Sequence, residues 1–241
     1  MLHKPPGWTP LEAMEDLRAR TPALAGEPMV YAGRLDPMAE GLLLVLTGED
    51  RFGLPAHLTH DKRYEATLLF GVRSDTHDAL GRLASGLGGA PPPDCAEAVA
   101  GLGGTHTLPL PVWSAYRVRG RPLHAWAREG RLHEISVPVR DMVVTAVERV
   151  AATTVRPSAL LDDVHARITR VRGTFRQAEA LADWAGLGEL DLPLVQVTAT
   201  LTVTSGTYIR ALAHDVGARL GCGALLLALR RTRVGPYEAA D

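Results

Sequence analysis

The chain has 241 residues, of which 46% are hydrophobic and 22% charged, a composition typical of one globular domain or two small ones. Its formal net charge of −1 excludes a protein that coats nucleic acid through bulk positive charge. No apolar run reaches the roughly 18 residues of a membrane span, and the first residues lack the apolar core of a secretory signal. Cys95 and Cys222 show no disulfide or metal-site spacing. We therefore expect a cytoplasmic protein without membrane association.

Three elements are predicted in the first third of the chain. Thr9, with Glu12 three residues later, forms a capping box, and Pro10 suits the first position of a helix. The run 42–46 is apolar on both faces and fits either a buried strand or the core of a short helix. Residues 63–71 alternate as a half-buried strand does. The side chains expected inside are Leu11, Met14 and Leu17 of the helix and Tyr64, Ala66, Leu68 and Phe70 of the strand.

Further along, helices alternate with one long strand. Asp94, with Glu97 as a second capping box, is expected to begin a helix, and residues 122–130 form another short one. Residues 195–204 alternate strictly and predict a strand, after which the period becomes helical from residue 209.

Residues 156–190 interrupt this strand-rich region. They are expected to form two helices, the second capped by Thr174 with Gln177. We interpret this segment as a helical insertion.

The basic residues are almost all arginines, and only Lys4 and Lys62 are lysines. This bias indicates that both positions favour a compact ammonium group. Arginines cluster between Arg117 and Arg131 and again at Arg230, Arg231 and Arg233, where the simplest interpretation is solvated surface.

Five stretches stand out as motifs. The first two are "KPPGWT", which fits K-P-x-G-x-[ST], and "GRLDPMAEGLL", which fits G-x-L-D-P-x-A-x-G-[LV]-L. The others are "KRYEATLLFGVRSDTHDALG", "LPVWSAYRVRGRPLHAWAREG" and "SGTYIRALAHDVGARLGCGALLLALRRTRVG". In this order they resemble the motifs of the TruB-type pseudouridine synthases, which isomerise a uridine in the TΨC loop of tRNA.

The resemblance implies an α+β fold with a mixed, mainly antiparallel sheet, flanking helices and a central active-site cleft. It also implies one catalytic domain, residues 1–241, that converts uridine 55 of tRNA to pseudouridine without a cofactor or a metal. The partner would be the TΨC stem-loop of tRNA, and we expect a monomer.

The resemblance also assigns roles to single residues. Asp36 matches the nucleophile, and Pro37 keeps its backbone out of the α region. Arg210 matches the arginine that pairs with this carboxylate, and Arg34 is a second candidate. Tyr64 matches the tyrosine that stacks on the flipped base and could remove its C5 proton. The expected substrate-binding residues are Tyr31, Lys4, Lys62, Tyr208 and Leu229. The two lysines are expected to hold phosphates or to brace the active-site loop.

The chain departs from the family pattern before Asp36 and at its end. Residues 30–33 replace the family's G-H-T-G, so Tyr31 either substitutes for the histidine by stacking or marks a changed RNA target. Arg34 completes "RLD", a triplet typical of the related RluA and RsuA synthases. No C-terminal RNA-binding module of the PUA type is expected. That role could pass to the arginines of the helical insertion, which are Arg167, Arg170, Arg172 and Arg176.

Two alternatives come from other functional classes. The changed residues 30–32 fit a catalytically inactive RNA-binding or tRNA-folding protein on the same scaffold. Asp75, His77 and Asp78 of "SDTHDALG" could instead bind Mg²⁺ or Zn²⁺ in a hydrolase, although a turn explains that stretch better.

Overall fold

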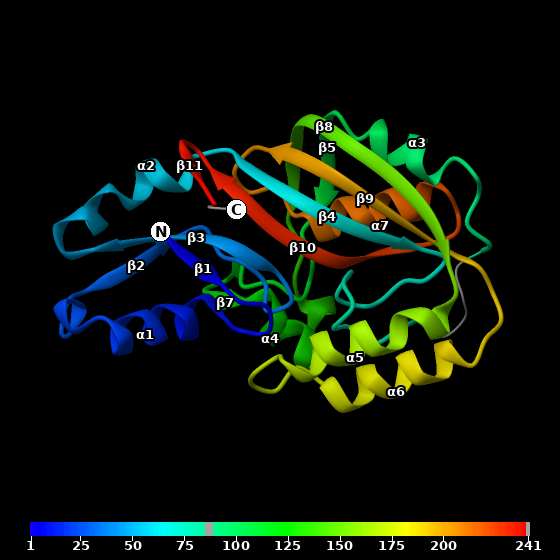
Figure 1. Cartoon of the computed structure of the whole chain (residues 1–241), viewed down its shortest axis with the longest axis horizontal. Helices are drawn as coiled ribbons and strands as arrows, with labels where there is room; N and C mark the ends of the chain where they lie inside the picture. The colour runs from blue at the N-terminus through cyan, green and yellow to red at the C-terminus, as the bar shows by residue number, and fades with distance from the viewer. Residues whose placement is uncertain (85–88, 240–241) are drawn as a thin grey trace.

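The computed structural model describes residues 1–84 and 89–239, and nine of the strands in this part of the chain form one mixed sheet (Figure 1). The strand order is β1-β3-β10-β4-β9-β8-β5, with β2 paired to β3 and β11 paired to β10. The pairs of named strands run antiparallel except for β3 with β10. The α+β prediction is therefore confirmed.

The strands of this sheet are β1 Leu2–Lys4, β2 Met29–Ala32, β3 Glu40–Thr47, β4 Lys62–Phe70, β5 Gly104–Pro109, β8 Val139–Val155, β9 Leu194–Val203, β10 Ala224–Val234 and β11 Tyr237–Glu238. A separate hairpin consists of β6 Arg117–Val118 and β7 Arg121–Pro122. The apolar run 42–46, for which the sequence left strand and helix open, lies within strand β3.

The helices are α1 Pro10–Arg20, α2 Leu54–Leu58, α3 Cys95–Ala100, α4 Leu123–Arg128, α5 Leu161–Thr169, α6 Gln177–Gly188 and α7 Ile209–Arg219. Figure 1 shows α7 behind the sheet, and α5 beside α6 below the strands in this view. None of the helices within the described residues is both long enough and apolar enough to cross a bilayer.

The sheet separates two hydrophobic clusters. Leu68 and Phe70 of β4 face the cluster that contains the apolar stripe of α7, whereas Leu69 faces the cluster that contains α5 and α6. This alternation follows from the two-residue period of a strand. Helices thus cover both faces of the sheet at β4: α7 covers one face, and α5 and α6 cover the other. The covered strands hold the start of α7 and the loop before β3 in fixed positions. The buried apolar stripe of α7 includes Ile209, Leu212, Ala213 and Val216.

Helix α1 shows that a local capping signal was sufficient to locate its start. Thr9 Oγ1 accepts a hydrogen bond from the Glu12 amide at 3.2 Å, and the Glu12 carboxylate accepts one from the Thr9 amide at 2.7 Å. The expected burial of Leu11 was wrong, because this side chain is 52% exposed. The side chains that face inward are Pro10, Ala13, Met14 and Leu17. The stripe therefore includes the predicted Met14 and Leu17, but Pro10 takes the place of Leu11.

Two other predicted capping boxes were wrong. Asp94 is the N-cap residue of α3, as expected, but its side chain makes no capping hydrogen bond. Helix α6 begins after Arg176, which has φ 61° and provides no side-chain cap, so Thr174 is not its N-cap. Instead, Gln177 accepts a hydrogen bond from the Phe175 amide. The left-handed backbone of Arg176 accompanies a tertiary ion pair with Asp75, a contact that a local pattern does not encode.

Gly41 lies where β3 pairs with Arg231 of β10. It has φ +103°, and an added Cβ would overlap the carbonyl of Arg231. Replacing Gly41 with alanine should therefore lower the free energy of unfolding in urea by about 2 kcal/mol or more. Gly103→Ala is the control, because an added Cβ there meets no atom within 4 Å among those described. Equal stability losses in both variants would contradict this packing.

Candidate functional site

A pocket of about 650 Å³ lies between the start of α7, strands β4 and β10, and the loop that precedes β3. Side chains that are distant in sequence converge on it. Six of the eight predicted site residues line this pocket: Asp36, Lys62, Tyr64, Tyr208, Arg210 and Leu229. The other two, Lys4 and Tyr31, do not line it.

The central contact of the pocket is an ion pair between Asp36 and Arg210. Arg210 Nε donates to Asp36 Oδ2 at 2.7 Å, and Nη2 donates to Oδ1 at 3.2 Å. The Arg210 side chain is 4% exposed and the Asp36 side chain 32%, so the carboxylate can be reached from the pocket while its partner is buried. Arg34, the second candidate partner, instead donates to the Tyr31 hydroxyl at 3.0 Å.

A second carboxylate, Asp78, lies on the other side of Arg210. Its Oδ2 is 3.6 Å from Arg210 Nε, and burial raises the pKa of Asp78, which Arg210 opposes. Thr76 and the Leu80 amide donate to its Oδ1 at 2.6 and 3.1 Å. Although burial disfavours the Arg210 cation, Asp36 and Asp78 outweigh this effect and raise its pKa. One buried cation therefore balances two carboxylates.

His77 stacks on His214, with ring centroids 3.9 Å apart and planes 1° from parallel. Burial, with smaller effects of His214 and Arg210, lowers the pKa of His77 to about 3, and burial also lowers the pKa of His214. Two neutral rings therefore join the 74–82 turn to α7, one helical turn beyond Arg210.

The hydrolase alternative is not supported by the positions of its proposed ligands. Asp75 pairs with Arg176, His77 stacks on His214, and Asp78 lies beside Arg210. In the described ranges, no group of three His, Cys, Asp or Glu side chains is arranged to hold a metal ion.

Two buried lysines support the site in different ways. Lys4 is fully buried, and its Nζ donates to the carbonyls of Ala39 at 2.5 Å, Pro5 at 3.0 Å and Pro37 at 3.4 Å. Of its two expected roles, this geometry fits support of the Asp36 loop. Lys62 lines the pocket and donates to the Leu58 carbonyl at 3.0 Å. Burial is the main cause that lowers the pKa of each lysine to about 8.

Arg231 is a functional candidate that the sequence analysis missed. It is 1% exposed, which corrects its assignment to solvated surface. Its guanidinium donates to the carbonyls of Leu42 at 2.7 Å, Gly33 at 3.1 Å and Arg34 at 3.5 Å. Lys4 thus holds the chain directly after Asp36, whereas Arg231 joins the chain before Asp36, at Gly33 and Arg34, to Leu42 of β3. The two-residue strand period was an available signal, since it places Arg231 on the same face as the pocket residue Leu229.

Three other predicted residues form a partly apolar wall around Asp36. Tyr64 on β4 is 7% exposed, and Leu229 on β10 is 9% exposed. Tyr208 lies at the N-terminal cap of α7, where burial and then Asp36 raise the pKa of its hydroxyl. Tyr31 lies on β2 and packs against the cluster of Leu2, Ala13 and Leu43, outside the pocket lining, so its contact with RNA stays a prediction.

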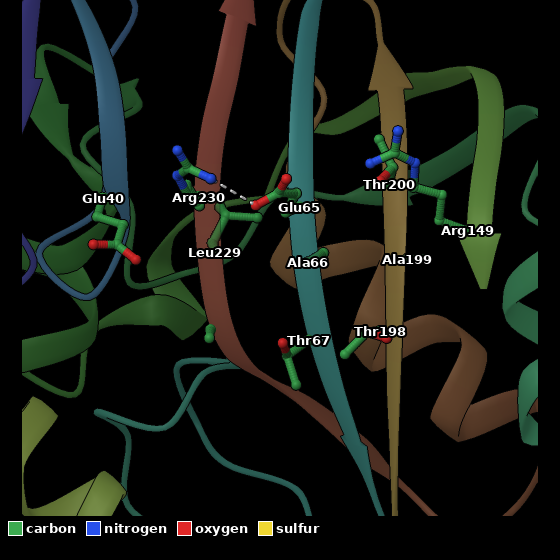
Figure 2. Close-up of a pocket in the computed structure, with 11 residues that line it drawn as sticks. Glu40, Glu65, Ala66, Thr67, Arg149, Thr198, Ala199, Thr200, Leu229 and Arg230 are labelled. Atoms are coloured by element: carbon green, nitrogen blue, oxygen red, sulfur yellow. Dashed lines mark hydrogen bonds and ion pairs between the residues drawn. The ribbon is translucent and has the colours of Figure 1, made fainter. Parts of the chain in front are cut away.

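Figure 2 shows a second hollow, of about 380 Å³, across β4, β9 and β10. Thr67 and Thr198 project into it, and Arg230 pairs with Glu65 at 3.2 Å. Both charged side chains of this pair are more than a third exposed. This hollow lacks the buried cation with a reachable carboxylate that distinguishes the Asp36 pocket.

Comparison with known proteins agrees with the motifs. A model of the TruB family pseudouridylate synthase N-terminal domain matches residues 24–175, and one of the tRNA pseudouridylate synthase B C-terminal domain matches residues 210–241. The chain is 36% identical over 248 residues to a tRNA pseudouridine synthase B of Thermobifida fusca, covering 98% of this chain and 69% of the relative. The chain belongs to the TruB family.

Other relatives of this TruB-family protein include tRNA pseudouridine synthase B of Ralstonia nicotianae, 34% identical over 98% of this chain and 62% of the relative. The chain thus spans about two thirds of the length of these two relatives. A solved Cbf5-Nop10-Gar1 complex contains a chain that is 22% identical, with a TM-score of 0.58 over 98% of this chain and 48% of that one. This similarity shows the shared fold.

Arg210→Met should lower the free energy of unfolding by about 3 to 5 kcal/mol near pH 8, because two carboxylates lose their buried cation. Since the folded-state pKa of Asp78 lies above its unfolded value, Asp78 favours the folded state at low pH, and that contribution is lost as pH rises through the folded pKa. Without Arg210 its charged form costs more, so the stability loss should be smaller at pH 5 than at pH 8.

Urea unfolding at both pH values measures this difference. Arg219→Met on the same helix is the control, because it removes only an exposed pair with Asp215 and should cost at most about 1 kcal/mol. A loss in Arg210→Met that is equally large at both pH values would refute the proposed charge balance.

Proposed function

We propose that this TruB-family protein isomerises a uridine of tRNA to pseudouridine, at position 55 in the TΨC loop, with Asp36 as the nucleophile. The observation that carries the proposal is the Asp36–Arg210 ion pair, with its carboxylate reachable from the pocket. A carboxylate needs an opposing cation to stay ionised in a partly dry site, and Arg210 provides it.

The proposed reaction needs no external reagent. Asp36 attacks the nucleoside, the N1–C1′ bond breaks, and the freed uracil turns within the pocket. A new C5–C1′ bond then forms, the proton on C5 leaves, N1 gains a proton, and the bond to Asp36 breaks. Tyr64 is the candidate that accepts the C5 proton. Substrate and product contain the same atoms at the same oxidation level, so the proposal includes no cofactor or metal.

The pocket wall suits a base that has left its stack. A base inside folded RNA must be extruded before it can react, and an aromatic face recovers part of the lost stacking energy. Tyr64, Tyr208 and Leu229 would enclose the uracil, while Lys62 at the pocket edge would meet a phosphate. We further propose that the protein acts as a cytoplasmic monomer on the TΨC stem-loop, and that Tyr31 contacts RNA outside the pocket.

Asp36→Asn should lower the rate of isomerisation by roughly 10⁴-fold or more, because an amide cannot act as the nucleophile. Its affinity for RNA should change little. Tritium release from a TΨC-arm transcript labelled at uridine C5 measures the rate, and filter binding measures the affinity. Asp16→Asn on α1, which loses an exposed pair with Arg20, is the control and should keep full activity.

The same assay separates the alternatives. A wild-type protein that binds the transcript but completes no turnover would be an RNA-folding protein. Turnover on another hairpin in place of the TΨC arm would show a shifted target. Undiminished turnover by Asp36→Asn would remove the assignment of the nucleophile.

RNA affinity should weaken as pH rises through about 8, because burial and then Arg231 lower the pKa of Lys62 to about 8. Above that pH the free protein has lost this positive charge, which phosphate binding must then restore. Lys62→Arg should bind with nearly constant affinity from pH 7 to 9, and Lys62→Met should bind weakly throughout. Equal pH profiles for the wild type and Lys62→Arg, at constant salt, would contradict this role.

A further inference from the structure

The segment with α5 and α6 touches three loops that surround Asp36. Figure 1 places the two helices side by side, and the linker between them spans residues 170–176. This region was expected to be an insertion, and its arginines were candidates for RNA contact. Two of these arginines, Arg172 and Arg176, contact other parts of the protein.

The first contact is with the N-terminal motif. The Arg172 amide donates to the Gly7 carbonyl at 3.0 Å, and the Gly7 amide donates to the Pro37 carbonyl at 2.8 Å. Gly7 has φ +89°, and an added Cβ would overlap the carbonyl of Arg170, so the two loops are in direct contact. Two consecutive hydrogen bonds therefore join the linker to the residue next to Asp36.

The second contact is with the 74–82 turn, in which the Thr76 carbonyl accepts a hydrogen bond from Arg210 at 2.7 Å. Arg176 donates to both oxygens of Asp75, at 2.6 and 3.1 Å. On α6, Asp183 accepts from Arg82 and from the Leu83 amide, and the buried Trp184 indole donates to the Ala79 carbonyl at 3.0 Å. The linker thus holds the start of this turn at Asp75, and α6 holds it at Ala79, Arg82 and the adjacent Leu83.

The third contact is between the linker and the loop that contains Trp113, and it is made by stacking of an arginine on an aromatic ring. The guanidinium of Arg176 lies 4.0 Å from the ring centroid of Trp113, the neighbour of the pocket residue Ser114. The guanidinium of Arg172 lies 4.0 Å from the ring centroid of Trp8, the neighbour of Gly7. Both arginines are therefore engaged within the protein.

We propose that the α5–α6 segment is a positioning element, which aligns the three loops so that Arg210 and Asp36 meet in reactive geometry. The contacts reach Pro37, Asp75 and Trp113, each next in sequence to a residue of the site: Asp36, Thr76 and Ser114 respectively. Misplacement of a reacting group by about 1 Å can cost 100-fold in rate, so this alignment acts on catalysis more than on binding. The proposal rests on the proposed isomerase activity.

The residue chemistry at position 176 is specific. An arginine can bond a carboxylate through two parallel N–H groups while its plane lies on an aromatic ring, whereas a lysine can do neither. Arg176→Lys should therefore behave like Arg176→Gln, although it keeps the charge and hence any general attraction for RNA.

The test compares single-turnover rates at saturating TΨC-arm RNA with the Kd of each variant. Arg176→Gln, Arg176→Lys and Asp75→Asn should each lower the rate about tenfold or more and leave Kd within about twofold. The double variant Asp75→Asn/Arg176→Gln should be no slower than the slower single variant, because both substitutions break the same Arg176–Asp75 pair. Asp163→Asn, which breaks an outward pair with Arg167 on α5, is the matched control and should keep the rate.

A raised Kd with an unchanged rate would make the linker an RNA-binding surface and overturn the proposal. Unchanged values for all variants would also overturn it. If wild type completes no turnover, the proposed function fails separately. The alignment is then judged by hydrogen exchange in residues 33–40, which should accelerate in folded Arg176→Lys and not in Asp163→Asn. Equal exchange in both variants would overturn the positioning role.

Discussion

The structure depends on one buried guanidinium between two carboxylates. Arg210 is 4% exposed and contacts both Asp36 and Asp78, so its charge is balanced only when the loop before β3 and the 74–82 turn are in place. Each loop in turn needs the cation, because a buried carboxylate without a partner costs several kcal/mol. Folding of these two loops and assembly of the site therefore occur together.

Buried cations also fix the backbone on either side of Asp36. Arg231 donates to Gly33 and Leu42, while Lys4 donates to Pro37 and Ala39. Such bonds to carbonyls satisfy acceptors that would otherwise be buried without partners, at the price of desolvating two charges. Lys4 could be singled out from the sequence because lysine is rare in this chain. Arg231 was not singled out, because the carbonyls to which it donates lie nearly 200 residues earlier in the chain.

Local signals predicted local structure, and the ordered motifs predicted most of the pocket. The Thr9–Glu12 cap was correct because both partners lie within one helical turn. The same pattern was wrong at Thr174, where the tertiary pair of Arg176 with Asp75 accompanies a later helix start. Leu11 was misplaced because periodicity gives spacing and leaves open which of two adjacent stripes faces the core. The contacts of the α5–α6 segment with the loops around Asp36 join residues about 60 to 165 positions apart, and no periodicity encodes them.

In the proposed reaction, a uridine of tRNA leaves its stack and enters the pocket beside Asp36. The most direct measurement is a crystal structure of the Asp36→Asn variant bound to a TΨC stem-loop RNA. We predict a flipped uridine between Tyr64 and Leu229, with its nucleoside within about 3.5 Å of residue 36, as a near-attack geometry requires. This placement of the uridine would be contradicted if the target uridine stayed stacked in its loop. It would also be contradicted if the RNA bound elsewhere while this pocket contained no base.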